Sequence, residues 1–205
     1  MNNRNIIVAL AVVALLAVAA TTAGCATNTT PSPTPIPVTT TVSGNNTTFS
    51  SGAGFNITYP KTLKADTNTS TTTPVRIYIY LNPNEIIDGV PVGTQVAAGQ
   101  TLANFVDSQL KELQNRSSVG FYKNFTILNE TNSTFAGKPA HTIVWSGIIP
   151  IQYNQTTATN ASVKEMQTFV VNNNTGYVIT YKAISSDYDT YLAQAQRIMN
   201  SFVLT

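Results

Sequence analysis

Two residues that occur only once limit the chemistry open to this chain: His141 and Cys25. A Ser or Cys nucleophile needs a base, so a nucleophile–base pair would have to use His141. That histidine alternates with Ile143 and Trp145 on a predicted strand, which favours a packed, structural role. One Cys excludes an internal disulfide, and one Cys with one His excludes a Cys/His zinc site. The sequence therefore predicts no catalytic residue, no metal site and no cofactor.

The acidic residues are scattered, and outside the last predicted helix the closest pair is Glu85 with Asp88. Both lie in a predicted loop over 83–99, where their oxygens could bind a cation, but this segment lacks the ligand density of a calcium site. A solvated turn is the favoured interpretation. A ligand platform of strand tyrosines on one sheet face is a second candidate, although such residues usually pack and hydrogen-bond at the sheet surface. The tyrosines concerned are Tyr78, Tyr80, Tyr177 and Tyr181.

The composition is poor in charge. Charged residues make up 10% of the 205 residues, with 11 basic and 9 acidic side chains and a net charge of +2. Ordinary soluble domains carry roughly 25% charged residues. A chain with so few basic residues lacks the electrostatic footprint of nucleic-acid binding, so no nucleic-acid partner is predicted. Asn, Thr and Ser provide the polar groups instead.

The N-terminus has the pattern of a secretion signal. Arg4 precedes the fifteen apolar residues 6–20, a length typical of a signal peptide and short of the roughly 20 residues of a spanning helix. Thr22-Ala23-Gly24-Cys25 then resembles the lipobox of secreted lipoproteins, with Thr22 in place of the usual Leu. Residues 1–24 are thus predicted to be a signal peptide and Cys25 the lipid attachment site, with an uncleaved anchor as the alternative. Both place the remaining chain on the outer face of the cytoplasmic membrane, with that membrane as its partner.

A tether is predicted next, over residues 25–51. Thr, Pro, Ser and Asn account for most of this segment, and prolines alternate with other residues at Pro31, Pro33, Pro35 and Pro37. Proline fixes φ and removes backbone donors, and so polar a segment buries too little apolar surface to offset its ordering entropy. The segment is therefore interpreted as a spacer between membrane and domain.

Residues 52–205 have the patterns of one globular domain. Two helices are predicted, one capped by Thr101 and one capped by Ser186 with Asp187 and Asp189 in its first turn. Asn172–Gly176 is predicted to be a hairpin turn. Strands connected by hairpins, with helices between and after them, indicate an α+β fold in which an antiparallel β-sheet is flanked by helices. The strands are predicted at residues 54–60, 75–81, 125–128, 140–149, 163–171 and 177–184.

Three blocks of the domain resemble PsbP-like domains, particularly the secreted PsbP-related proteins of archaea. They are Gly54-Phe55-Asn56-Ile57-Thr58-Tyr59-Pro60, Phe135-Ala136-Gly137-Lys138-Pro139-Ala140, and the stretch from Tyr177-Val178-Ile179-Thr180-Tyr181 to Ser201-Phe202. The resemblance departs from the family where Thr62-Leu63-Lys64 replaces a usual Trp. It implies an α/β/α sandwich around an antiparallel sheet. It does not imply a photosystem function, since a fold alone does not carry one.

Asn-x-Ser/Thr sequons are more frequent than composition explains. The chain has twelve, whereas its Ser and Thr content predicts roughly five by chance. The excess favours an N-glycosylated surface protein, with an uncharged Asn/Thr surface as the alternative. The candidate sites within the domain are Asn56, Asn68, Asn115, Asn124, Asn129, Asn132, Asn154, Asn160 and Asn173.

These observations predict a membrane-tethered, extracytoplasmic PsbP-like domain that is not an enzyme. The favoured role is a binding or assembly accessory module with an envelope protein as a possible partner. A structural glycoprotein of the cell surface is the first alternative. An envelope hydrolase that uses carboxylates such as Glu85, or His141, is the second.

Overall fold

Antiparallel strands make up most of the structure. The computed structural model describes residues 36–68, 75–82, 87–152 and 158–205. Seven strands form one sheet in the order β4-β5-β6-β10-β9-β8-β7, and four form a second in the order β1-β2-β3-β11. All of these neighbours pair antiparallel. The strands are β1 Val38–Ser43, β2 Asn46–Ser51, β3 Phe55–Pro60, β4 Ala65–Asn68, β5 Arg76–Tyr80, β6 Gly89–Val96, β7 Lys123–Phe135, β8 Lys138–Gln152, β9 Ala158–Asn172, β10 Thr175–Ile184 and β11 Val203–Leu204.

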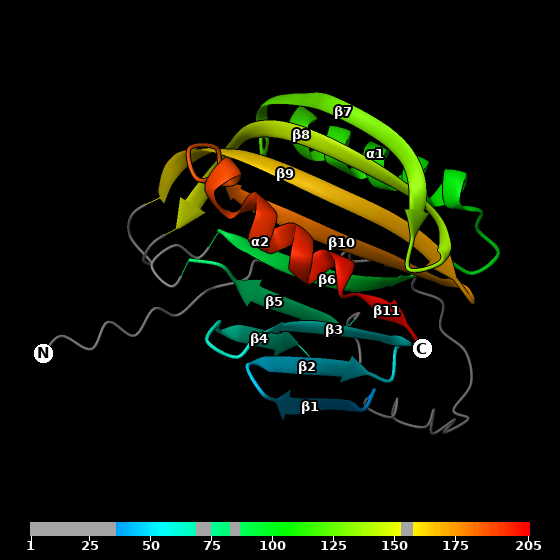
Figure 1. Ribbon diagram of the computed structural model, residues 1–205. Helices are drawn as coiled ribbons and strands as arrows, with labels where there is room; N and C mark the ends of the chain where they lie inside the picture. The colour runs from blue at the N-terminus through cyan, green and yellow to red at the C-terminus, as the bar shows by residue number, and fades with distance from the viewer. Residues whose placement is uncertain (1–35, 69–74, 83–86, 153–157) are drawn as a thin grey trace, which may run out of the picture.

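Two helices cover opposite faces of the seven-stranded sheet (Figure 1). Helix α1 spans Leu102–Ser118 and contacts β7, β8 and β9, whereas α2 spans Tyr188–Asn200 and contacts β10, β6 and β3. Alternation along each strand supplies both faces with apolar side chains. On β10, for example, Ile179 and Tyr181 join the core under α2, while Val178 packs with the core under α1. The predicted α+β fold with helices on both sides of an antiparallel sheet is confirmed.

The four-stranded sheet closes the core on the α2 side. Phe55 of β3 stacks on Phe202 at 5.4 Å between ring centroids and meets Tyr177 of β10 edge-on at 6.2 Å. Ser201, at the end of α2, donates a hydrogen bond to the carbonyl of Thr58 and accepts one from its N–H. These contacts join β3 to Ser201 and Phe202, so separating the two segments would expose aromatic surface to water.

Helix α1 begins where the sequence predicts it. The Thr101 hydroxyl accepts a hydrogen bond from the Asn104 N–H at 3.2 Å, which satisfies one of the free donors of the first turn. Phe105 then lies against Gly176 so closely that a Cβ at Gly176 would overlap the phenyl ring. The absence of a side chain at Gly176 is therefore what lets α1 approach the first residues of β10.

The predicted start of the domain at residue 52 is wrong. Residues 38–51, expected within the tether, form β1 and β2. Phe49 of β2 is 1% exposed and packs on Phe55 at 5.8 Å between centroids. Threonine is β-branched and suits a strand, so a Thr-rich segment pairs readily once Phe49 supplies an apolar anchor. The predicted signal peptide, Cys25 and the first three alternating prolines lie outside the described residues.

Other predicted boundaries also differ. The strand predicted at 125–128 extends to Phe135 as β7, because pairing with β8 stabilises residues that have no apolar alternation. The segment 83–99, predicted as a loop, contains β6, whose Pro91 and flanking glycines disguise the strand pattern. Asp187 rather than Ser186 stands at the N-cap of α2, and its side chain makes no capping bond. The hairpin turn at Asn173 and Asn174 is confirmed, since both have positive φ.

Neither helix in the described part of the chain is long and apolar enough to cross a membrane.

We predict that Phe49→Ala destabilises the domain by about 3–5 kcal/mol, because it removes a buried aromatic side chain and leaves a cavity. Urea denaturation of the full chain measures the change. Thr40→Ala on β1, where the side chain is exposed, is the matched control and should change stability by less than about 0.5 kcal/mol. Equal stability of the two variants would show that β2 is not part of the cooperative unit.

Candidate functional site

A buried carboxyl group lies on the α1 side of the seven-stranded sheet. Glu165 of β9 shares its face with Val163 and Phe169, and its side chain is 8% exposed. The Gln167 amide donates a hydrogen bond to Glu165 Oε1 at 2.6 Å. Lys182, the residue opposite on β10, places Nζ 3.9 Å from Glu165 Oε2. A buried carboxylate requires such partners because removal from water otherwise penalises its charge.

Aromatic residues enclose this carboxyl group on its other side. Trp145 of β8 pairs directly opposite Glu165 and is fully buried. Tyr122, which follows α1, packs on the Trp145 ring at 5.1 Å between centroids. The Trp145 Nε1 is buried and has no hydrogen-bond partner among the described residues. We refer to Glu165, Gln167, Lys182, Trp145 and Tyr122 as the Glu165 cluster.

Burial dominates the electrostatics of the cluster. It raises the pKa of Glu165 above its ordinary range, and the charge of Lys182, the hydrogen bond from Gln167 and the charge of Arg116 only partly oppose this effect. Burial likewise raises the pKa of Tyr122. The arrangement can hold a proton on a carboxyl group. The polar atoms of Glu165, Gln167 and Lys182 are directed at one another, which is typical of a structural network rather than of a nucleophile with its base.

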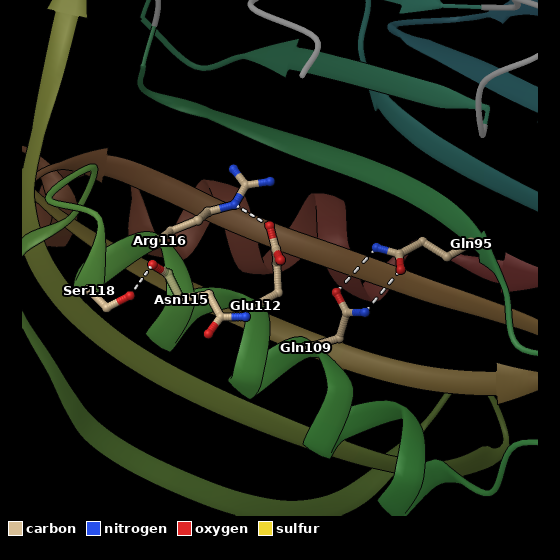
Figure 2. Close-up of polar contacts among 6 residues, drawn as sticks. All are labelled: Gln95, Gln109, Glu112, Asn115, Arg116 and Ser118. Atoms are coloured by element: carbon tan, nitrogen blue, oxygen red, sulfur yellow. Dashed lines mark hydrogen bonds and ion pairs between the residues drawn. The ribbon is translucent and has the colours of Figure 1, made fainter. Parts of the chain in front are cut away.

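Polar side chains on α1 tie the helix to the sheet beside this cluster (Figure 2). Gln109 and Gln95 of β6 exchange two amide hydrogen bonds, at 2.9 and 3.2 Å. Further along the same helix, Arg116 Nε donates to Glu112 Oε1 at 2.7 Å, and Figure 2 shows the guanidinium directed over the sheet. The amide pair links α1 to a strand that its apolar face does not cover. It therefore fixes the angle at which the helix lies over the sheet.

A second polar site surrounds the single histidine. The His141 Nδ1 lies 2.8 Å from Asn132 Oδ1, and its Nε2 lies 3.6 Å from Glu130 Oε2. These residues line a pocket of about 260 Å³ between α1 and the β7–β8 hairpin. The remaining lining comes from α1: Leu102, Ala103, Val106, Asp107 and Leu110. We refer to it as the His141 pocket.

The carboxylates and tyrosines that the sequence singled out do not form one site. Asp88, expected in a solvated turn, is fully buried and accepts a hydrogen bond from the Ile184 N–H at 2.9 Å. Glu85 lies outside the described residues. Tyr177 and Tyr181 pack under α2, as do Ile77 and Ile79, which alternate with Tyr78 and Tyr80 along β5. The four tyrosines therefore lie on two opposite faces, so they do not form the single platform that the sequence left as an alternative.

Each tyrosine has a local structural role. Tyr78 and Tyr80 pack together at 4.7 Å between ring centroids, and Tyr80 donates to Asp66 Oδ2 at 2.8 Å. Burial and this hydrogen bond raise the pKa of Tyr80 to about 12. Tyr181 donates to the carbonyl of Tyr188 at 2.6 Å and so links β10 to α2.

Most candidate glycosylation sites are exposed. Asn56 is half-buried within β3, and Asn154 lies outside the described residues. Asn124 and Asn173 adopt positive φ in exposed backbone. The exposed candidates are Asn68, Asn115, Asn124, Asn129, Asn132, Asn160 and Asn173. Their use as glycan sites stays a prediction.

Sequence reasoning missed the Glu165 cluster, although a signal was present. Val163, Glu165, Gln167 and Phe169 alternate on one face of a predicted strand, so a carboxylate stood in an apolar series. A carboxylate buried at such a position requires a hydrogen-bond donor or a cation as its partner. The partner, Lys182, becomes evident only from the register that the Asn172–Gly176 hairpin imposes on β9 and β10.

The fold is of the PsbP-like type. It resembles the solution structure of cyanobacterial PsbP (CyanoP) from Synechocystis sp. PCC 6803, with a TM-score of 0.55, 11% identity and coverage of 89% of this chain and 98% of that one. LpqN of Mycobacterium tuberculosis, described as involved in cell envelope biogenesis, gives a TM-score of 0.46 at 14% identity over 83% of this chain and 91% of its own. The Pseudomonas aeruginosa protein PA94, of unknown function, gives 0.45 at 11% identity over 79% and 99%. No protein-family model and no curated protein matches the sequence.

The raised pKa of Glu165 predicts a pH-dependent contribution to stability. The folded chain holds this proton more tightly than the unfolded chain, so the contribution is complete below the ordinary pKa of about 4.3 and is lost as pH rises through the higher folded value. We therefore expect Glu165→Gln to lose less stability than the unaltered chain between about pH 4 and pH 8. Urea midpoints across that range measure it. The control is Glu112→Gln, an exposed carboxyl group on α1, and identical pH profiles for all three chains would contradict the prediction.

The His141 contacts predict its tautomer. An amide oxygen only accepts hydrogen bonds, so the Nδ1 that faces Asn132 Oδ1 carries a hydrogen, and in the neutral ring Nε2 is then bare. We expect ¹⁵N shifts of the single histidine at alkaline pH to report the Nδ1–H form. Asn132→Ala should remove this preference, whereas Asn129→Ala, at another exposed asparagine of β7, should retain it. An Nε2–H tautomer in the unaltered chain would overturn the assignment.

Proposed function

We propose that this chain is a membrane-tethered, extracytoplasmic PsbP-like module that acts by binding or assembly rather than by catalysis. The N-terminal pattern supplies the attachment and the PsbP-like domain supplies the binding body. An envelope protein is the partner that fits a domain held at a membrane surface.

The observation that carries the proposal is how soon the folded domain follows Cys25. Strand β1 begins at Val38, 13 residues after Cys25. At roughly 3.4 Å for each extended residue, that segment spans at most about 45 Å. A lipid on Cys25 would therefore hold the domain within about one domain diameter of the membrane. This supports a partner in the membrane or close above it.

The geometry favours binding over hydrolysis. His141 hydrogen-bonds to the Asn132 amide, and its other nitrogen faces the carboxylate of Glu130. A base that activates a nucleophile lies within hydrogen-bond reach of a Ser, Thr or Cys. The hydrogen bond that the described residues give to His141 is to an amide, which fits the structural role inferred from the sequence.

A structural glycoprotein is the second candidate, and the exposure of seven of the nine sequons favours it. Three of them, Asn124, Asn129 and Asn132, lie on β7, which forms one edge of the seven-stranded sheet. Glycans there would prevent that edge from pairing with other chains. Crosslinking distinguishes the two candidates. An accessory module should crosslink to a different protein, whereas a coat protein should crosslink mainly to other copies of itself.

Intact-mass analysis of the full chain, extracted from the membranes of its native host, tests the attachment. We expect a species that begins at Cys25 and carries added lipid mass. Cys25→Ser should lack that mass, and Thr22→Leu, which restores the usual lipobox residue, should retain it. A species with an unmodified Met1 terminus would contradict lipid attachment and indicate the uncleaved anchor. The same spectra test glycosylation, since a mass limited to polypeptide and lipid would exclude it.

A further inference from the structure

When the His141 ring is neutral with hydrogen on Nδ1, the His141 pocket contains two acceptors, His141 Nε2 and Glu130 Oε2, that face each other without a donor. With hydrogen on Nδ1, the neutral His141 ring directs a bare Nε2 toward Glu130 Oε2 at 3.6 Å. That distance exceeds the range of a hydrogen bond. Nε2 is also buried and has no hydrogen-bond partner among the described residues. A buried acceptor in this state favours any group that brings it an N–H.

The charge around this gap is negative. Asp107 of α1 and Glu130 of β7 both line the pocket, and the lining contains no Lys or Arg. Two carboxylates favour a cation over an anion or a neutral donor. A cation that carries N–H groups satisfies both the charge and the bare acceptors, because one ammonium nitrogen can donate to the imidazole and to the carboxylate at once.

The opposite wall is apolar. Leu102, Val106 and Leu110 follow one another at four-residue spacing, so they form one stripe of α1 that faces the pocket. At about 260 Å³ the pocket lies just below the size range of sites for drug-sized ligands. It therefore suits a small molecule with a short hydrocarbon chain next to its charged group.

We propose that the His141 pocket binds a small primary ammonium with an apolar tail, donating to His141 Nε2 and Glu130 while the tail packs on α1. This inference stands independently of the proposed attachment, because it concerns a ligand of the domain itself. It also gives Asn132 a function: its amide holds the imidazole in the tautomer that accepts from the ligand.

The single histidine makes the test direct. Full-length chain labelled at histidine ¹³Cε1 and held in detergent micelles gives one imidazole resonance, which reports the pocket. At about pH 8 an alkylammonium keeps its proton. We expect n-butylammonium to shift this resonance saturably, with a Kd on the order of 1–10 mM for so small a ligand. Tetramethylammonium, a cation without N–H groups, and n-butanol, which is uncharged, should each bind at least about tenfold more weakly.

Two matched variants locate the binding. Glu130→Gln, at a partly exposed position, should weaken n-butylammonium at least about fivefold, whereas Glu112→Gln at the far end of α1 should change it less than about twofold. The ¹⁵N tautomer signature verifies that the pocket is intact in both. The proposal is overturned if n-butylammonium gives no saturable shift, if tetramethylammonium binds as tightly, or if Glu130→Gln binds normally. A response to Zn²⁺ alone would likewise overturn it and assign the pocket to a metal.

Discussion

Strand β10 must satisfy two different environments at once, because it lies inside the seven-stranded sheet and its faces meet different layers. Toward α2 it presents an apolar series that packs with the helix and with the four-stranded sheet. Toward α1 it presents Val178 to the core and, nearer its C-terminal end, Lys182, which lies beyond the strands that α1 contacts. The helices are thus offset laterally as well as placed on opposite faces (Figure 1). This offset leaves part of the sheet on the α1 side uncovered by α1. The Glu165–Lys182 pair lies there, and the Gln167 hydrogen bond and the charge of Arg116 partly offset the burial of Glu165.

The same offset explains why the two polar sites differ. The Glu165 cluster lies deep, and Glu165 has Gln167 and Lys182 as partners, so removing one of them leaves a buried carboxyl group with less compensation. The His141 pocket lies at the other end of α1, against the outermost hairpin, and its Nε2 has no hydrogen-bond partner among the described residues. One site stabilises the sheet, and the other is available to a ligand. Native structures carry few buried polar atoms without a hydrogen-bond partner, so His141 Nε2 and Trp145 Nε1 each call for an explanation.

Features set by a few neighbouring residues were predicted correctly from the sequence. Features set by pairing between strands were missed. Thr101 and the turn at Asn173 act within a few residues, so each was identified correctly. Strand β1 and the outer half of β7 have no apolar alternation, because their side chains are mostly exposed on both faces and their order comes from a neighbouring strand. The Glu165 cluster depends on register across three strands and the His141 pocket on the angle of α1. Neither the strand register nor the angle of α1 can be read from any single residue.

The β1–β2 hairpin has a mechanical consequence in the proposed tethered arrangement. The tether enters at Val38, whose partner Ser51 lies at the open end of the hairpin, opposite the turn at Gly44. A load that draws the tether away from β2 therefore peels β1 one residue pair at a time instead of shearing all pairs together. Five of its six residues are exposed, so β1 can detach while Phe49 stays in the core. Its release adds roughly 20 Å of chain, which makes the hairpin an extensible link that yields before the domain unfolds.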